Sequence, residues 1–169
     1  MTPDTTGQPK TRVLFVCIGN SCRSQMAEAF ARSYGGDVLT AASAGLSPAI
    51  SVARDTIRAM AERDLDLRDH FPKSIRHLGR AQFDIAINLS GSPLPPSVAP
   101  RVLEWDVEDP IGMSYEEHCE IRDHVERLVM KLVMDLRRDR GGPPLRGQGS
   151  SSGSAEPPLR GQGSRFRQT

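Results

Sequence analysis

The sequence predicts a single α/β domain built on a four-stranded parallel sheet with helices on both faces. Short apolar runs rich in β-branched residues alternate with longer segments of helical periodicity, which is the pattern of a parallel sheet covered by helices. The chain has 169 residues, enough for one domain with a substantial core and a tail. These two observations define the fold class before any motif is considered.

The expected elements follow in chain order. Strands are predicted at 12–16, 37–43, 83–89 and 102–105, where apolar runs are bounded by glycines or turn residues. Helices are predicted at 24–33, where Gly35-Gly36 provides the stop, and at 52–63 and 114–138. The last helix carries apolar residues at helical spacing, namely Ile121, Val125, Leu128, Val129, Leu132, Val133 and Leu136.

The chain divides into three parts by composition. Residues 1–11 are predicted to be a flexible N-terminus, 12–140 the folded domain, and 141–169 a disordered tail rich in Pro, Gly, Ser and Arg. The tail repeats one eight-residue segment, from Pro143 and again from Pro157, and holds seven glycines and four prolines in 29 residues. Such a composition cannot offset the conformational entropy of the chain. An Arg-Gly interaction tail is the alternative.

Charge and cysteine usage exclude several functional classes. The 22 basic and 21 acidic residues give a net charge of +1, which does not suggest a nucleic-acid partner. No apolar run approaches a membrane span or a signal-peptide core, so we expect no membrane partner and a cytoplasmic location. Three cysteines in such a protein favour free or catalytic thiols. Cys119 beside His118 lacks a second ligand pair with zinc spacing, so we expect no metal site and treat Cys119 as an ordinary helix residue.

The segment from Cys17 to Ser24 indicates an oxyanion site around a thiol. It follows a predicted strand and precedes a predicted helix, which places Cys17 at the carboxyl edge of the sheet. Successive backbone N–H groups of such a loop can surround a tetrahedral anion, and the helix N-terminus points at the same place. Arg23 can add a two-pronged donor. The same positive field favours the Cys17 thiolate, which is the nucleophilic form.

This segment resembles the low-molecular-weight protein tyrosine phosphatases and the arsenate reductases built on the same fold. The family loop is Cys-x5-Arg-Ser/Thr, usually with Gly-Asn inside it and Met-Ala-Glu after it. The matching positions are Cys17, Gly19, Asn20, Cys22, Arg23, Ser24, Met26, Ala27 and Glu28. The resemblance covers roughly 12–138 and implies the family's fold, with Cys17 as nucleophile and Arg23 as oxyanion clamp.

A second motif, Asp109-Pro110, lies 92 residues after Cys17 and follows the predicted strand 102–105. It therefore belongs to the same edge of the sheet, where a carboxylic acid could protonate a leaving oxygen. The family has an aspartate-proline loop here, and Asp109 matches its general acid. Asp106 and Glu108 are weaker candidates, and a simple turn is the alternative reading of the motif.

The remaining site residues are expected to bind the oxyanion or support the loop. Asn20 suits a left-handed turn, Ser24 could donate to the sulfur, and the resemblance implies a second shell of Ser43 and His70. We favour a structural hydrogen bond over proton transfer for His70. Cys22 is either a small buried residue or a partner that protects Cys17 by a reversible disulfide. The loop candidates are Ile18, Gly19, Asn20, Ser21, Cys22 and Ser24.

The resemblance favours the arsenate-reductase branch. Phosphotyrosine phosphatases of this kind usually carry tyrosines after the aspartate-proline, whereas Ile111-Gly112-Met113 follows here. Thioredoxin-coupled reductases carry two more cysteines after the third strand, whereas this chain has Ser90 and Ser92. We therefore expect an arsenate reductase with no bound cofactor that uses an external thiol, glutathione or mycothiol, with a possible redoxin partner. The alternatives are a phosphotyrosine protein phosphatase or other phosphomonoester hydrolase, and a non-catalytic anion-binding module.

Overall fold

A computed structural model describes residues 7–141 and shows one four-stranded sheet in the order β2-β1-β3-β4, with every neighbouring pair parallel. The predicted α/β class is confirmed. The N-terminal residues 1–6 and the tail 142–169 lie outside the described residues. The elements are β1 (Thr11–Cys17), α1 (Arg23–Gly35), β2 (Leu39–Gly45), α2 (Arg54–Ala61), the 3₁₀ helix η1 (Ile75–Leu78), β3 (Ile85–Asn88), β4 (Arg101–Glu104) and α3 (Tyr115–Asp139).

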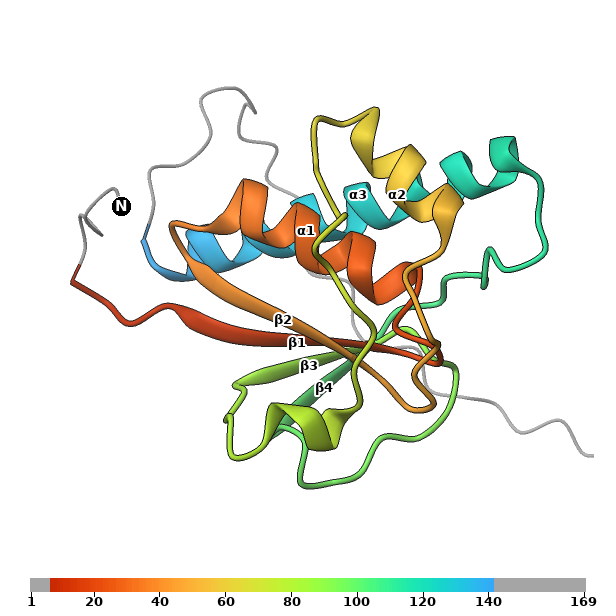
Figure 1. The fold of residues 1–169 in the computed structure, drawn as a ribbon. Helices are drawn as coiled ribbons and strands as arrows, with labels where there is room; N and C mark the ends of the chain where they lie inside the picture. Colours follow the sequence, from red (N-terminus) through yellow and green to blue (C-terminus); the bar gives the residue numbers. More distant parts are fainter. Residues whose placement is uncertain (1–6, 142–169) are drawn as a thin grey trace, which may run out of the picture.

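The central strand β1 separates two apolar layers, because successive side chains of a strand point to opposite faces. Val13 and Phe15 lie in the larger core, with residues of α1, α2 and α3. Leu14 and Val16 lie in a smaller core, where residues of η1 pack against them. Figure 1 shows the three α-helices above the sheet and η1 below it. The two faces are therefore covered unequally.

The predicted ends of the strands and helices differ from the observed ends by at most two residues. The second strand begins at Leu39 rather than at residue 37, because the chain still turns there and the Val38 N–H donates back to the Gly35 carbonyl at 2.9 Å. The short helix η1 was not predicted, since four residues are too few to show a period. The start of α3 agrees within one residue, and Ser114 and Glu117 form a reciprocal capping box there.

The topology sets the position of the site. From β1 the chain crosses through α1 to β2 on one side, whereas β3 lies on the other side of β1. Strand order therefore reverses next to β1, and in open parallel sheets ligands bind beyond the carboxyl ends of the strands at such a point. The loops after β1, β3 and β4 meet there.

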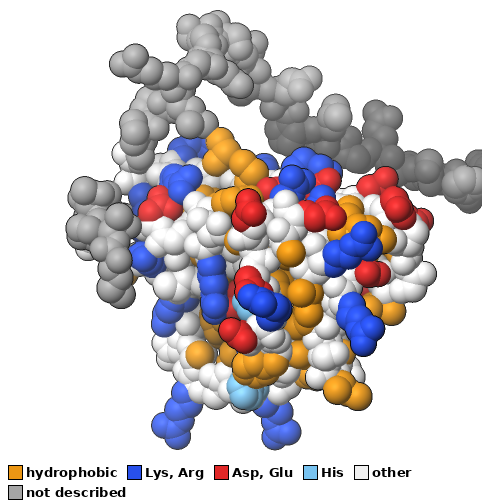
Figure 2. Space-filling view, turned by 45° about the horizontal axis from the view of Figure 1, so that its top comes forward, with side chains coloured by type: hydrophobic (Ala, Val, Ile, Leu, Met, Phe, Trp, Pro, Cys, Tyr) orange, Lys and Arg blue, Asp and Glu red, His pale blue; other side chains and the backbone are white. Residues whose placement is uncertain are grey.

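The surface carries charges of both signs. Figure 2 shows arginine and lysine side chains interspersed with aspartate and glutamate over one face, as the nearly neutral net charge suggests. Within residues 7–141, no helix is both long enough and apolar enough to span a membrane.

Candidate active site

The loop after β1 turns its carbonyl groups outward. The carbonyls of Cys17, Ile18, Gly19 and Ser21 each accept a backbone N–H from the segment that follows β2, at 2.8–3.2 Å. The backbone N–H groups of residues 18–23, by contrast, donate to no acceptor in the described part of the chain. Since carbonyl and N–H groups of such a loop point in opposite directions, these N–H groups form a concave set of donors suited to an oxyanion.

Gly45, at the end of β2, makes this arrangement possible. A Cβ at this position would lie 2.6 Å from the Ile18 carbonyl oxygen and 2.9 Å from the Asn20 nitrogen. Only glycine allows the two chain segments to approach so closely. Asn20 itself has a φ of 48° and is fully buried, which agrees with the expected left-handed turn.

The Asn20 side chain directs hydrogen bonds toward the thiol. Its Nδ2 donates to the Ser24 Oγ at 2.7 Å and to the Ser43 Oγ at 2.9 Å. Because an amide nitrogen only donates, the Ser24 hydroxyl proton remains free for the Cys17 Sγ, which lies 2.9 Å from the Ser24 Oγ. The network therefore supplies the sulfur with a donor, and a donor stabilises a thiolate.

Buried groups behind Asn20 complete this network. The Ser43 hydroxyl donates to the carboxylate of Glu28, which also pairs with a nearby arginine. Gln25 donates to the Asn20 Oδ1 at 3.1 Å, and its own carbonyl oxygen lies 2.9 Å from the His70 Nδ1. Burial lowers the pKa of His70 below its ordinary value. The contacts of His70 are those of a structural residue.

Arg23 is held by two backbone carbonyls from different loops. Its Nη1 donates to the Leu89 oxygen at 2.6 Å and to the Val107 oxygen at 3.0 Å. The first carbonyl follows β3 and the second follows β4. The guanidinium is nearly buried, with 7 % of its side chain exposed, so its position at the cradle is set by the fold and not by a flexible side chain.

Asp109 lies at the open side of the cradle. Its Oδ2 is 3.3 Å from the Arg23 Nη2, and its side chain is 47 % exposed. Its other oxygen accepts the Ile111 N–H at 3.2 Å, which closes a turn around Pro110. The structure therefore places Asp109, from the loop after β4, beside Arg23 of the loop that follows Cys17.

Known proteins resemble this chain in both fold and sequence. Residues 12–94 match the family described as low molecular weight phosphotyrosine protein phosphatase. Arsenate reductase 1 of Bacillus cereus is 34 % identical over 73 % of this chain and 95 % of its own length. The glutaredoxin arsenate reductase of Synechocystis is 36 % identical over 74 % of this chain and 98 % of its own.

The chain belongs to the low-molecular-weight phosphotyrosine protein phosphatase family. Solved structures agree with this assignment. One is an arsenate reductase in its phosphate-binding state, with a TM-score of 0.69, 33 % identity, and coverage of 75 % of this chain and 98 % of that one. Another is a low-molecular-weight protein tyrosine phosphatase of T. tengcongensis, with a TM-score of 0.66, 29 % identity, and coverage of 75 % and 99 %.

The aromatic residues near the aspartate-proline segment contact α2 and the core. Tyr115, the first tyrosine after the aspartate-proline, donates to Glu62 and lies under the guanidinium of Arg58 at 3.6 Å from its ring centroid. Trp105 packs on Phe15 in the core. The residues that directly follow Pro110 are aliphatic, and Ile111 is 63 % exposed.

The other two cysteines differ in their surroundings. Cys22 is 3 % exposed, and burial is the main cause that raises the pKa of its thiol. The hydroxyl groups of Thr56 and Ser21 oppose this rise in the pKa. Cys119 is partly exposed on α3. Within the described ranges, no cluster of three or more potential ligands could hold a metal ion.

Sequence reasoning missed several residues that shape this site. The sequence pattern singles out neither Gly45 nor Gln25, although one permits the loop geometry and the other joins Asn20 to His70. The buried contact between Thr56 and His118 is not predicted either. Their 62-residue separation offers no local signal, whereas the position of Gln25 directly after Ser24 could have indicated a supporting role.

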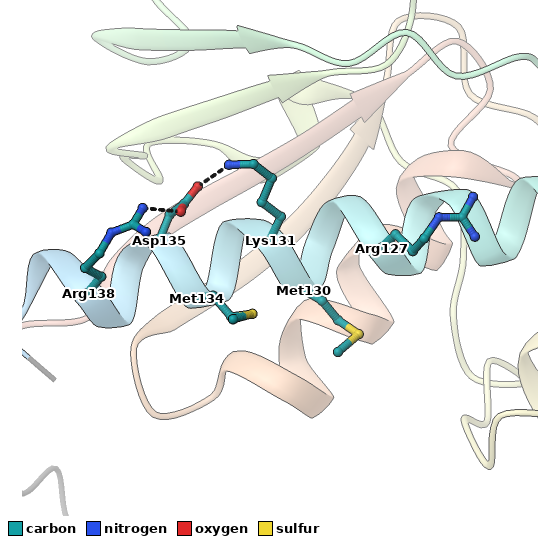
Figure 3. Close-up of a pocket in the computed structure, with 6 residues that line it drawn as sticks. All are labelled: Arg127, Met130, Lys131, Met134, Asp135 and Arg138. Atoms are coloured by element: carbon teal, nitrogen blue, oxygen red, sulfur yellow. Dashed lines mark hydrogen bonds and ion pairs between the residues drawn. The ribbon is translucent and has the colours of Figure 1, made fainter. Parts of the chain in front are cut away.

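A second hollow lies on the exposed side of α3, lined by Met130, Met134 and charged neighbours (Figure 3). Lys131 and Arg138 both pair with Asp135 in it. This half of α3 runs toward the start of β2, where Arg137 pairs with Asp37 at 2.7 Å. It is therefore at the amino ends of the strands, away from the cradle.

Proposed function

We propose that this protein is an arsenate reductase in which Cys17 is the nucleophile. The observation that supports this most directly is the set of N–H groups at residues 18–23, which donate to no acceptor within residues 7–141, beside a thiol that receives a hydrogen bond from Ser24. Such a site binds a small tetrahedral oxyanion and offers it a thiolate. The two curated relatives given above carry the name arsenate reductase.

The chemistry proceeds by attack of the Cys17 sulfur on arsenic. Arg23 and the loop N–H groups hold the arsenate oxygens, and Asp109 protonates the oxygen that leaves as water. This step forms an S–As(V) bond. Ile18, Gly19, Asn20, Ser21, Cys22 and Ser24 act as the oxyanion-binding and supporting residues, with Ser43 and His70 behind them.

An external thiol supplies the electrons for the second step. Its thiolate attacks the Cys17 sulfur, the S–As electron pair passes to arsenic to give arsenite, and a mixed disulfide remains on Cys17. Ser90 and Ser92 stand in the loop after β3, and the Ser90 hydroxyl donates to Asn88 at 2.6 Å, so this loop has no thiol to offer. We propose glutathione or mycothiol as the reductant, a redoxin as partner, and the cytoplasm as the location.

The test compares purified protein on arsenate with glutathione, mycothiol or thioredoxin systems. Arsenite formation with a small thiol and its redoxin is expected, and mass spectrometry after one turnover should show that thiol on Cys17. Cys17→Ser should abolish the reaction. Arsenite formation driven equally well by thioredoxin alone, with a Cys17–Cys22 bond as the product, would transfer the second step to Cys22.

Phosphomonoester hydrolysis is the second candidate, because the family match and the resemblance to the T. tengcongensis phosphatase favour it. The same cradle fits a phosphoryl group. However, a phosphotyrosine ring finds few stacking partners beside Ile111 and Gly112. Efficient hydrolysis of an aryl phosphate or phosphotyrosine peptide, with no arsenite from any thiol system, would establish the phosphatase activity instead.

A further inference from the structure

The loop after β3 is organised by one buried amide. Asn88, the last residue of β3, is 1 % exposed. Its Oδ1 accepts the Ser90 N–H at 3.0 Å and the Ser90 hydroxyl at 2.6 Å. Its Nδ2 donates to the Ser92 carbonyl at 2.7 Å and to the Glu104 carboxylate of β4 at 3.1 Å. Both donors of the amide and two acceptor positions are therefore in use, which fixes its orientation.

Leu89 lies between this amide and the guanidinium of the site. Its N–H donates to the Val16 carbonyl of β1 at 2.7 Å, and its carbonyl accepts the Arg23 Nη1 at 2.6 Å. The Leu89 carbonyl and the Ser90 N–H belong to one planar trans peptide group, so they point in opposite directions. The bond from this N–H to Asn88 therefore sets the direction in which the carbonyl points.

The direction of this carbonyl decides how the guanidinium faces the cradle. The Nη1 of Arg23 is shared by the carbonyls of Leu89 and Val107. A guanidinium is planar and carries its N–H donors in fixed directions, so anchoring Nη1 also orients the donors on Nε and Nη2. Nη2 reaches Asp109 at 3.3 Å, on the open side of the cradle. A two-pronged bond to an oxyanion thus depends on the carbonyl that holds Nη1.

The local sequence shows why an asparagine suits this position. A short polar side chain can accept the backbone N–H two residues further along, which closes a turn. Gly91 has a φ of 72° and continues this turn in the left-handed region. The Ser92 N–H then donates to the Ser90 hydroxyl at 3.0 Å. The loop is therefore closed on itself, and Glu104 supports it from the neighbouring strand.

We propose that Asn88 is a positioning residue for oxyanion binding, because it orients the peptide group after Leu89, whose carbonyl holds Arg23 toward the cradle. The amide is occupied by partners within the protein, so it acts through one peptide group and one guanidinium. The inference rests on the proposed role of Arg23 as oxyanion clamp. It applies equally to arsenate and to a phosphate ester.

The experiment measures the phosphate concentration that protects half of Cys17 from iodoacetamide. Two variants of the same size and shape are compared. Asn88→Val has no acceptor for the Ser90 N–H, whereas Asn88→Thr keeps one in its hydroxyl. Asn88→Val should require about tenfold more phosphate, the effect of losing one hydrogen bond to a charged group. Asn88→Thr should recover most of the affinity.

Two controls separate positioning from loop order and from stability. Ser90→Ala removes the hydroxyl bonds of the loop but keeps the backbone N–H, so the phosphate requirement should change little. Ile85→Ala leaves a cavity at the other end of β3 and should lower the melting temperature. It should nevertheless leave the phosphate requirement unchanged, because it does not touch the peptide group after Leu89.

A double variant tests whether the effect passes through Arg23. Arg23→Lys keeps a charge for phosphate but has no planar fork to orient, so adding Asn88→Val should weaken phosphate binding no further. An equal loss in both backgrounds would overturn the proposal, as would a normal phosphate requirement in Asn88→Val or equal impairment of Asn88→Val and Asn88→Thr. The assay uses neither arsenate nor a thiol reductant, so a failure of arsenate reduction would refute the proposed activity without altering this result.

Discussion

Replacement of Gly45 by alanine tests the geometry of the cradle most directly. The added Cβ would lie 2.6 Å from the Ile18 carbonyl oxygen, whereas ordinary contact begins at 3.4 Å, so the loop must retreat by about 0.8 Å (3.4 less 2.6 Å). Overpacking of this kind costs about 2 kcal/mol. At roughly 3 °C per kcal/mol, the melting temperature should fall by about 6 °C.

The functional loss should exceed the loss of stability. The Ile18 carbonyl accepts the Ser47 N–H at 2.8 Å, and its displacement rotates the peptide groups whose N–H atoms face the oxyanion. A misplacement on the order of 1 Å can cost about 10²-fold in rate. We expect turnover to fall by that factor, and protection of Cys17 from iodoacetamide to require far more phosphate.

Gly19 provides a matched control inside the motif itself. A Cβ there would lie 3.7 Å from the nearest atom, the Ala49 Cβ, which is ordinary contact. Gly19→Ala should therefore stay within about 0.5 kcal/mol of the unaltered protein and keep its phosphate affinity within about twofold. The reasoning fails if Gly45→Ala retains stability and phosphate protection, or if the two variants are impaired equally.

Three other measurements follow from the site and the chain ends. Iodoacetamide near pH 6 should label Cys17 quickly, and slowly when phosphate or arsenate is bound; equal, ligand-insensitive labelling of all three cysteines would contradict its role. On aryl phosphates, Asp109→Asn should slow reaction most for poor leaving groups, by about 10²–10⁴-fold. Truncation after Arg140 should leave turnover and melting temperature nearly unchanged, and a drop of more than about 5 °C would show that the tail contributes to the fold.

The sequence predicts the strand, loop and helix around Cys17 well because the information is local. An apolar run, a Gly-Asn pair and a periodic helix specify these elements without help from the rest of the chain. The prediction for β2 was displaced because Val38 resembles a strand residue, although its N–H completes the turn after α1. The residues of η1 show no periodic pattern in the sequence. The helix is therefore recognised only in the folded structure, where its residues pack against Leu14 and Val16.

The residues of the site likewise fall into two groups, those predicted from local sequence and those brought in from distant parts of the chain. Cys17 and Arg23 belong to the same loop, and their spacing in the sequence predicts that both act at one site. The carbonyls that hold Arg23 belong to Leu89 and Val107, which are 66 and 84 residues away. Any residue type supplies a carbonyl, so no pattern marks these positions. The contact of Thr56 with His118 is equally invisible, because it depends on how α2 packs against α3.

The two carbonyls on Arg23 also decide how the Asp109→Asn experiment is interpreted. The guanidinium is pinned by Leu89 and Val107 through Nη1, whereas Asp109 meets only Nη2, at 3.3 Å. Because the Asp109 side chain is half-exposed, this ion pair contributes at most about 1 kcal/mol. Its removal should not move Arg23, so phosphate should protect Cys17 as well in the variant as in the unaltered protein. A rate loss that depends on the leaving group then reports proton transfer alone, and a parallel loss of phosphate protection would show instead that Asp109 holds the clamp in place.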